Sequence, residues 1–231
     1  MTNGSAEHKG TIVFDLDGTL VDSVPDLAGA LDGLMMEMGL PAFGIPATRK
    51  LIGHGIANLV RGALTLRSIE WQHDQGLHAI TRFTELYSER LSRETRPYPD
   101  VKQTLSMLAE DGWQLAVCTN KIERYAKLIL SDLGLARFFP VIAGPDTFGV
   151  AKPDPRHLLE TASHAGGGDR IIFVGDSEVD ISTAKAAGVP VIAVSYGYAK
   201  TPLAALLPEA LVDRFSDIPK AIDDIARECP S

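Results

Sequence analysis

The sequence has few cysteines and fewer basic than acidic residues. Each of these two shortages excludes a class of protein. Its two cysteines, Cys118 inside an apolar run and Cys229 near the C-terminus, do not form the framework of a small disulfide-stabilised domain. This cysteine usage predicts a reducing compartment. With 22 basic against 30 acidic residues, the formal charge of −8 argues against a nucleic acid or an anionic membrane as partner. An anionic ligand would therefore need local positive groups.

The chain also lacks long apolar runs. No stretch reaches the length of a transmembrane helix, and the polar start MTNGSAEHKG has no apolar core of a signal peptide. We therefore predict a cytoplasmic protein whose residues 1–10 form a mobile tail. With 231 residues, 45% of them hydrophobic, the chain can bury a core that needs neither a disulfide nor a structural metal.

Short apolar runs alternate with amphipathic segments over most of the chain, which is typical of a parallel α/β sheet. The runs are apolar on both faces, as strands covered by helices on two sides should be. Glycines or prolines mark many of the helix boundaries between them, for example Pro155 at a start and Gly134 and Gly188 at ends. The predicted strands are 11–16, 114–119, 141–143, 171–174 and 190–194.

One long segment interrupts this alternation. Between Leu20 and about Pro97 only helical patterns appear, whereas a parallel crossover needs about a dozen residues. The predicted fold is a doubly wound parallel sheet with a Rossmann-like core, residues 11–19 and 97–231, and an inserted all-helical cap, residues 20–96. Arg96 and Pro97 begin a proline-containing stretch that suits the return to the core.

The first predicted strand runs into two carboxylates, in the sequence DLDGTLVDS starting at Asp15. Alternation along a strand would bring Asp15 and Asp17 out on the same side. Two neighbouring acids repel each other unless a cation lies between them or they share a proton. The pair therefore predicts either a divalent metal site or acid–base chemistry.

Further polar groups follow later strands, and ligands of doubly wound sheets bind where strands end. Thr119 and Asn120 lie at the end of one predicted strand, Lys152 follows the next, and the sequence GDSEVD follows the fourth. Each has a simpler interpretation: a helix cap for Asn120, a solvated loop position for Lys152, and a helix start at Asp176. Their joint placement at one sheet edge favours a shared site.

These motifs, in this order, resemble those of the haloacid dehalogenase superfamily, in its phosphatases with a helical cap. The four signatures are DLDGT, Thr119-Asn120, Lys152-Pro153 and GDSEVD, and the resemblance spans about residues 11–225. Within the superfamily the chain most resembles the phosphoglycolate phosphatases, through the segments LIGHGIANLVRGAL and AVSYGYAK.

The resemblance implies a role for each residue of the first motif and for the metal. Asp15 would be the nucleophile that forms an aspartyl-phosphate, and Asp17 would be the general acid and base. Mg²⁺ would be held by the side chains of Asp15 and Asp176 and by the backbone carbonyl of Asp17. Asp180 would orient a metal-bound water.

The remaining motifs would bind the phosphoryl group. Thr119, with Asn120 and backbone N–H groups of the following helix, would hold phosphoryl oxygens, and Lys152 would offset charge between nucleophile and phosphate. In the cap, Arg61 and His54 are candidates for the rest of the substrate. Arg61 suits a second anion such as a carboxylate, unless it simply lies on the solvated face of its helix.

An acid at position 17 favours a phosphate ester over a halide, since a poor leaving group needs a proton. The resulting prediction is an Mg²⁺-dependent phosphomonoesterase acting on a small phosphorylated metabolite, with 2-phosphoglycolate favoured. A sugar phosphomutase of the same superfamily is the alternative, and a signalling phospho-acceptor or a silent binding protein is less favoured. We predict a monomer or a homodimer without nucleic-acid or membrane partners.

Overall fold

A computed structural model describes residues 9–228 except 54, 72, 167 and 169. Its contacts divide the chain into two compact units, one of residues 1–20 and 97–231 and the other of residues 21–96. Two short strands, β2 (Val21–Asp22) and β3 (Arg96–Pro97), pair at the points where the chain passes between the units. In the described residues no helix is long and apolar enough to cross a membrane.

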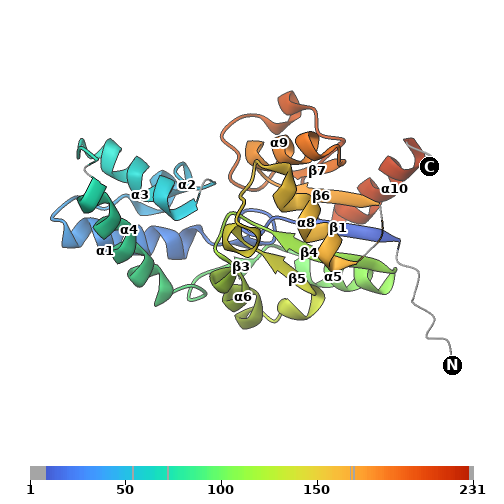
Figure 1. Ribbon diagram of the computed structural model, residues 1–231, viewed down its shortest axis with the longest axis horizontal. Helices are drawn as coiled ribbons and strands as arrows, with labels where there is room; N and C mark the ends of the chain where they lie inside the picture. The colour runs from blue at the N-terminus through green and yellow to red at the C-terminus, as the bar shows by residue number, and fades with distance from the viewer. Residues whose placement is uncertain (1–8, 54, 72, 167, 169, 229–231) are drawn as a thin grey trace. The chain divides into compact units, whose positions relative to one another are not determined.

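The first unit is built on a six-stranded sheet in the order β5-β4-β1-β6-β7-β8, and most of this order can be followed in Figure 1. All five ladders between neighbouring strands are parallel. The strands are β1 (Gly10–Phe14), β4 (Trp113–Cys118), β5 (Val141–Ala143), β6 (Ile171–Gly175), β7 (Val191–Val194) and β8 (Ala210–Val212). The doubly wound parallel sheet predicted from the sequence is confirmed.

Apolar side chains on both faces of the central strands explain why helices cover both sides. On one face, Val13 and Phe173 belong to a buried cluster with residues of α8 (Pro155–Ala165) and α9 (Glu178–Ala187). On the other face, the ring of Phe14 packs on Phe215 and Phe139, with centroids 5.8 and 6.2 Å apart. Close packing on both faces therefore holds β1 in place, and the carboxyl end of this strand is a rigid support for the residues that follow it.

The remaining helices of this unit connect the strands or follow the last one. They are α5 (Val101–Glu110), α6 (Glu123–Asp132), α7 (Pro145–Phe148) and α10 (Ile218–Glu228). Three short 3₁₀ turns accompany them: η1 (Ala136–Phe138), η2 (Leu203–Leu206) and η3 (Phe215–Asp217).

The second unit is helical apart from its border strands. Its described helices are α1 (Val24–Glu37), α2 (Gly44–Arg49), α3 (Gly55–Leu66) and α4 (His73–Ser88). Asp26 of α1 is fully buried, and its Oδ2 accepts hydrogen bonds from the backbone N–H groups of Glu94 and Thr95 and from the Thr95 hydroxyl. This network joins the first and last segments of the unit.

Both ends of the first predicted strand differ from those observed, and three other predicted strands differ by one residue at one or both ends. Strand β1 starts at Gly10, inside the stretch predicted to be a tail, because Gly10 pairs with Trp113. It ends at Phe14 and not at Leu16, since the chain bends directly after Asp15. Strand alternation is therefore the wrong reason for the closeness of Asp15 and Asp17.

Candidate active site

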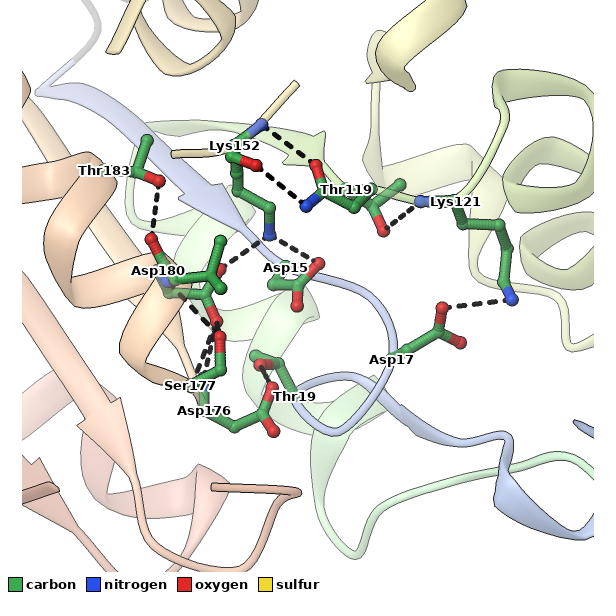
Figure 2. Close-up of polar contacts among 12 residues, drawn as sticks. Asp15, Asp17, Thr19, Thr119, Lys121, Lys152, Asp176, Ser177, Asp180 and Thr183 are labelled. Carbon is green, nitrogen blue, oxygen red and sulfur yellow. Dashed lines mark hydrogen bonds and ion pairs between the residues drawn. The ribbon is translucent and has the colours of Figure 1, made fainter. Parts of the chain in front are cut away.

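The polar residues predicted to share a site do meet at the carboxyl edge of the sheet. In the ladders, Phe14 of β1 is paired with Val117 of β4 and with Val174 of β6, so the three strands end at nearly the same level. The residues that follow these ends, Asp15, Thr119 and Asp176, therefore emerge beside one another (Figure 2). Apart from Arg61 and His54, all of the site residues described below lie in the first compact unit.

A buried lysine joins two of the acids. Lys152 Nζ lies 2.9 Å from Asp15 Oδ1 and donates a hydrogen bond of 2.6 Å to Asp180 Oδ1. Its side chain is only 2% exposed, so the interpretation of Lys152 as a solvated loop lysine is wrong. Burial of an ammonium group is costly unless partners of opposite charge surround it, and these two carboxylates meet that condition.

The backbone of Lys152 is fixed by Asn120. The Asn120 amide accepts from Lys152 N at 2.9 Å and donates to Lys152 O at 3.0 Å. The N-cap of α6 is Ile122, so the capping interpretation of Asn120 is also wrong. The Asn120 side chain thus positions the backbone of Lys152. A contact between Asn120 and a substrate stays a prediction.

Asp176 is held from two sides. The hydroxyl of Thr19 donates to its Oδ1 at 2.9 Å, and the backbone N–H of Tyr198 donates to its Oδ2 at 2.6 Å. Gly18 and Gly197 pack so closely on this carboxylate that a Cβ at either position would lie 2.3 Å from an Asp176 atom. Two glycines and two donors therefore set the direction of Asp176.

We expect Gly197→Ala to weaken metal binding. The new methyl group would overlap the Asp176 carboxylate, and the neighbouring backbone donor of Tyr198 leaves little room for a shift. Calorimetric titration with Mg²⁺ should show at least about tenfold weaker binding, a loss of about 1.4 kcal/mol. Gly33→Ala is the matched control, because Gly33 lies within α1 and a Cβ there would make only an ordinary contact with the Leu86 side chain, at 3.4 Å. Equal metal affinity of the two variants would contradict the role given to this packing.

Asp180 links the start of a helix to the lysine. Its Oδ2 accepts from the backbone N–H groups of Asp176 and Ser177 and from the Ser177 hydroxyl, while Oδ1 accepts from Lys152. Ser177 is the N-cap of α9 and Asp180 closes the capping box, so this segment does start a helix as well. The cap fixes the carboxylate that orients Lys152.

A second lysine, Lys121, belongs to the site and was not predicted. Its Nζ lies 3.0 Å from Asp17 Oδ2, and its backbone N–H donates to the hydroxyl of the buried Thr119 at 3.2 Å. The only sequence signal is its position directly after Thr119-Asn120. Asp15 and Asp17 are thus each paired with a different lysine.

The carboxylates of Asp15, Asp176 and Asp180 form a cluster that suits a divalent cation. One ligand atom from each lies within 4.8 Å of the others, and all three residues are buried. Together with Asp17 they are four acids against two lysines, a formal charge of −2 when all are ionised. Hard oxygen ligands with this charge are those that Mg²⁺ prefers.

The pKa values of the acids are shifted in the direction that a bound cation would oppose. Burial raises the pKa of Asp15 to about 7 against the opposing effect of Lys152, and the charge of Asp180 raises it further. Burial, then the charges of Asp180 and Asp15, raise the pKa of Asp176 well above its usual value. Burial disfavours the charge of Lys152, but Asp15 and Asp180 hold its pKa above the usual value. A divalent cation would favour the ionised acids.

Magnesium should therefore stabilise the protein more at about pH 8 than at about pH 5. Between about pH 4 and the raised pKa, the folded metal-free protein binds more protons at Asp15 and Asp176 than the unfolded chain. Its free energy of unfolding accordingly falls as the pH rises through this range, whereas metal binding requires the ionised acids. The measurement is the rise in melting temperature caused by Mg²⁺ at each pH. A rise that shrinks toward high pH would contradict this electrostatic account.

The two predicted residues of the helical unit remain untested. Arg61 lies on α3 with an exposed side chain, and its guanidinium group stacks over the ring of Trp71 at 4.7 Å. His54 lies outside the described residues. The binding roles of both residues stay predictions.

Comparison with known proteins agrees with this arrangement of motifs. The family described as haloacid dehalogenase-like hydrolase matches residues 12–194. The phosphoglycolate phosphatase of Mesorhizobium japonicum is 41% identical over 208 residues, covering 88% of this chain and 90% of the relative. That of Caulobacter vibrioides is 36% identical over 225 residues, covering 97% and 95%.

A solved structure agrees over the same length. The crystal structure of a predicted phosphoglycolate phosphatase from Haemophilus somnus superposes with a TM-score of 0.84 at 33% identity. The match covers 95% of this chain and 100% of that one. Both the helical insert and the sheet of the present chain lie within the matched length.

Proposed function

Because the chain belongs to the haloacid dehalogenase-like hydrolases, we propose that it is a phosphatase that hydrolyses small phosphate monoesters, with 2-phosphoglycolate favoured. The observation that carries the proposal is the cluster of Asp15, Asp176 and Asp180 with a buried lysine bound to two of them. A carboxylate beside a cationic group and two further acids suits a nucleophile next to a divalent cation, and this supports the proposal. The names of the relatives support the choice of substrate.

The proposed reaction has two steps at phosphorus. A carboxylate oxygen of Asp15 attacks the phosphorus atom, the ester oxygen leaves, and Asp17 gives that oxygen a proton. Asp17 then takes a proton from a water molecule that attacks the aspartyl-phosphate, and the products are inorganic phosphate and free Asp15. Dividing one displacement into two avoids direct attack of water on an anionic ester.

The surrounding residues compensate charge and orient the reacting groups during these steps. Lys152, at 2.9 Å from Asp15, offsets negative charge between carboxylate and phosphoryl group. The Thr119 hydroxyl would hold a phosphoryl oxygen. Asp15 and Asp176 through their side chains, and Asp17 through its backbone carbonyl, would hold Mg²⁺. When bound, the ion would screen the repulsion between the nucleophile and the phosphate.

Release of phosphate from a panel of substrates tests the proposed activity. Purified protein with Mg²⁺ is supplied with 2-phosphoglycolate, sugar phosphates, para-nitrophenyl phosphate and a phosphopeptide. We expect the highest kcat/KM for 2-phosphoglycolate and little phosphate from the phosphopeptide. Isomerised sugar phosphate without net phosphate release would show a phosphomutase. Failure to release phosphate from every compound would contradict the proposal.

Arg61→Ala should reduce selectivity for substrates that carry a carboxylate. If the guanidinium group pairs with that carboxylate, its loss removes a charged hydrogen bond of about 1.5–3 kcal/mol, or roughly ten- to a hundredfold in kcat/KM. Hydrolysis of para-nitrophenyl phosphate, which lacks the carboxylate, should change much less. Arg93→Ala, at another exposed arginine of the same unit, is the control. Equal losses of kcat/KM on both substrates would show that Arg61 stabilises the fold and does not recognise the carboxylate.

A further inference from the structure

The two acids of the first motif are paired with two different lysines, of which only Lys152 was a predicted site residue. Figure 2 shows Lys121 reaching Asp17 from the chain segment that follows Thr119, away from Lys152. The distance from Lys121 Nζ to Asp17 Oδ2 is 3.0 Å, with side chains 5% and 16% exposed. Lysine side chains usually extend into water, so a nearly buried one indicates a specific role.

The main chain of Lys121 makes a hydrogen bond on one side and packs closely on the other. Its N–H donates to Thr119 Oγ1, which ties it to the residue expected to hold the phosphoryl group. Its carbonyl oxygen packs against Gly144, directly after β5, where a Cβ would lie 2.5 Å away. The ends of β4 and β5 together thus aim the side chain at Asp17.

The charge of Lys121 is useful when Asp17 gives up its proton. As the leaving oxygen departs, negative charge forms on the Asp17 carboxylate, and an ammonium group at 3.0 Å compensates it. The proton comes from Asp17 and Lys121 keeps its own, so no further reactant is required. A fixed ion pair also holds the carboxylate in one direction, which matters because proton transfer requires hydrogen-bond geometry.

We propose that Lys121 is a positioning residue that orients Asp17 and compensates its charge during protonation of the leaving group. The proposal rests on the proposed function, since it assigns a residue to one step of that reaction. It predicts a dependence on the leaving group. Expulsion of an alkoxide needs the proton from Asp17, whereas para-nitrophenolate leaves without much help.

The test compares Lys121→Met with Lys127→Met on two substrates. Lys127 is an exposed lysine of α6 that pairs with Glu123, away from the site. Lys127→Met therefore changes the net charge by the same amount as Lys121→Met and leaves the site intact. Lys121→Met should lower kcat/KM for 2-phosphoglycolate by roughly ten- to a hundredfold, within the range of general acid catalysis, mainly through kcat. For para-nitrophenyl phosphate, Lys121→Met should change kcat/KM by less than about threefold. Lys127→Met should have the kcat/KM of the wild type on both substrates.

Two further measurements separate positioning from a structural role. Lys121→Arg should recover part of the lost kcat, because a guanidinium group also pairs with a carboxylate. In an Asp17→Asn background, Lys121→Met should have almost no additional effect on turnover, since both residues act in one step. The Mg²⁺-induced rise in melting temperature should be unchanged in Lys121→Met. If Lys121→Met does not fold, Lys121→Gln is measured in the same way.

Several results would overturn the proposal. Equal losses on both substrates, or full additivity with Asp17→Asn, would assign Lys121 to the fold or to phosphate binding. An increase in KM on both substrates with unchanged kcat would make Lys121 a ligand of the substrate. Absence of any phosphate release by wild type and Lys127→Met would instead contradict the proposed function, and the role of Lys121 with it.

Discussion

Replacing Asp15 by asparagine is expected to lower kcat by at least about 10⁴-fold, the scale seen when a covalent catalytic group is removed. An amide is not a usable nucleophile toward phosphorus. Asparagine has nearly the same shape, and its carbonyl oxygen still accepts from Lys152. Burial already disfavours the charge of Asp15 in the metal-free protein, so the variant should melt no lower than the wild type.

The measurement combines phosphate release with thermal unfolding followed by circular dichroism. Asp223→Asn, at an exposed aspartate of α10, controls for the loss of one negative charge. Substantial turnover by a folded Asp15→Asn protein would contradict the covalent mechanism. A strongly reduced melting temperature would show instead that the fold requires this carboxylate.

Removal of divalent cations should have an effect of similar size. Without the ion, the four carboxylates around the site outnumber the two lysines, and an anionic phosphate would meet uncompensated charge. A chelator should therefore reduce kcat to background, and Mg²⁺ should restore it. Ca²⁺ should inhibit, because it is larger and takes more ligands, including bidentate carboxylates, which would draw Asp15 out of position for attack.

Titration of the chelated protein with each cation measures this effect. The melting temperature, recorded in parallel, reports binding independently of turnover. Asp176→Asn should lose the stabilisation by Mg²⁺ along with activity, since Asp176 is a proposed ligand whose carboxylate is held in place by Thr19 and Tyr198. A full rate in the presence of excess chelator would contradict the metal site.

The sequence alone predicted the features that depend on local patterns. Strand β5 occupies the predicted residues 141–143, and α9 occupies Glu178–Ala187 with Gly188 after it, at a φ of 67°. A strand buried on both faces must be apolar throughout, and a left-handed residue after a helix favours glycine. Residues that follow parallel strands meet at one edge of the sheet, which is why the candidate site could be predicted there.

Features that depend on distant residues could not be predicted. Strand β8 lies at the edge of the sheet with Leu211 44% exposed, so it lacks the fully apolar pattern of the inner strands. A lysine in a loop is normally solvated. Lys121 is buried because it forms an ion pair with Asp17, a residue distant in sequence, so its burial could not be predicted. The amide of Asn120 binds a backbone, and backbone partners leave no signal in a sequence.

Trapping the phosphoryl-enzyme tests the central claim most directly. Wild-type protein and Mg²⁺ are mixed with radiolabelled 2-phosphoglycolate and quenched with acid before the first turnover is complete. The account predicts an acid-stable, hydroxylamine-sensitive label, characteristic of an acyl phosphate, on the peptide that contains Asp15, and none on Asp15→Asn. Phosphate released without any label on the protein, or a label on a different residue, would contradict attack by Asp15.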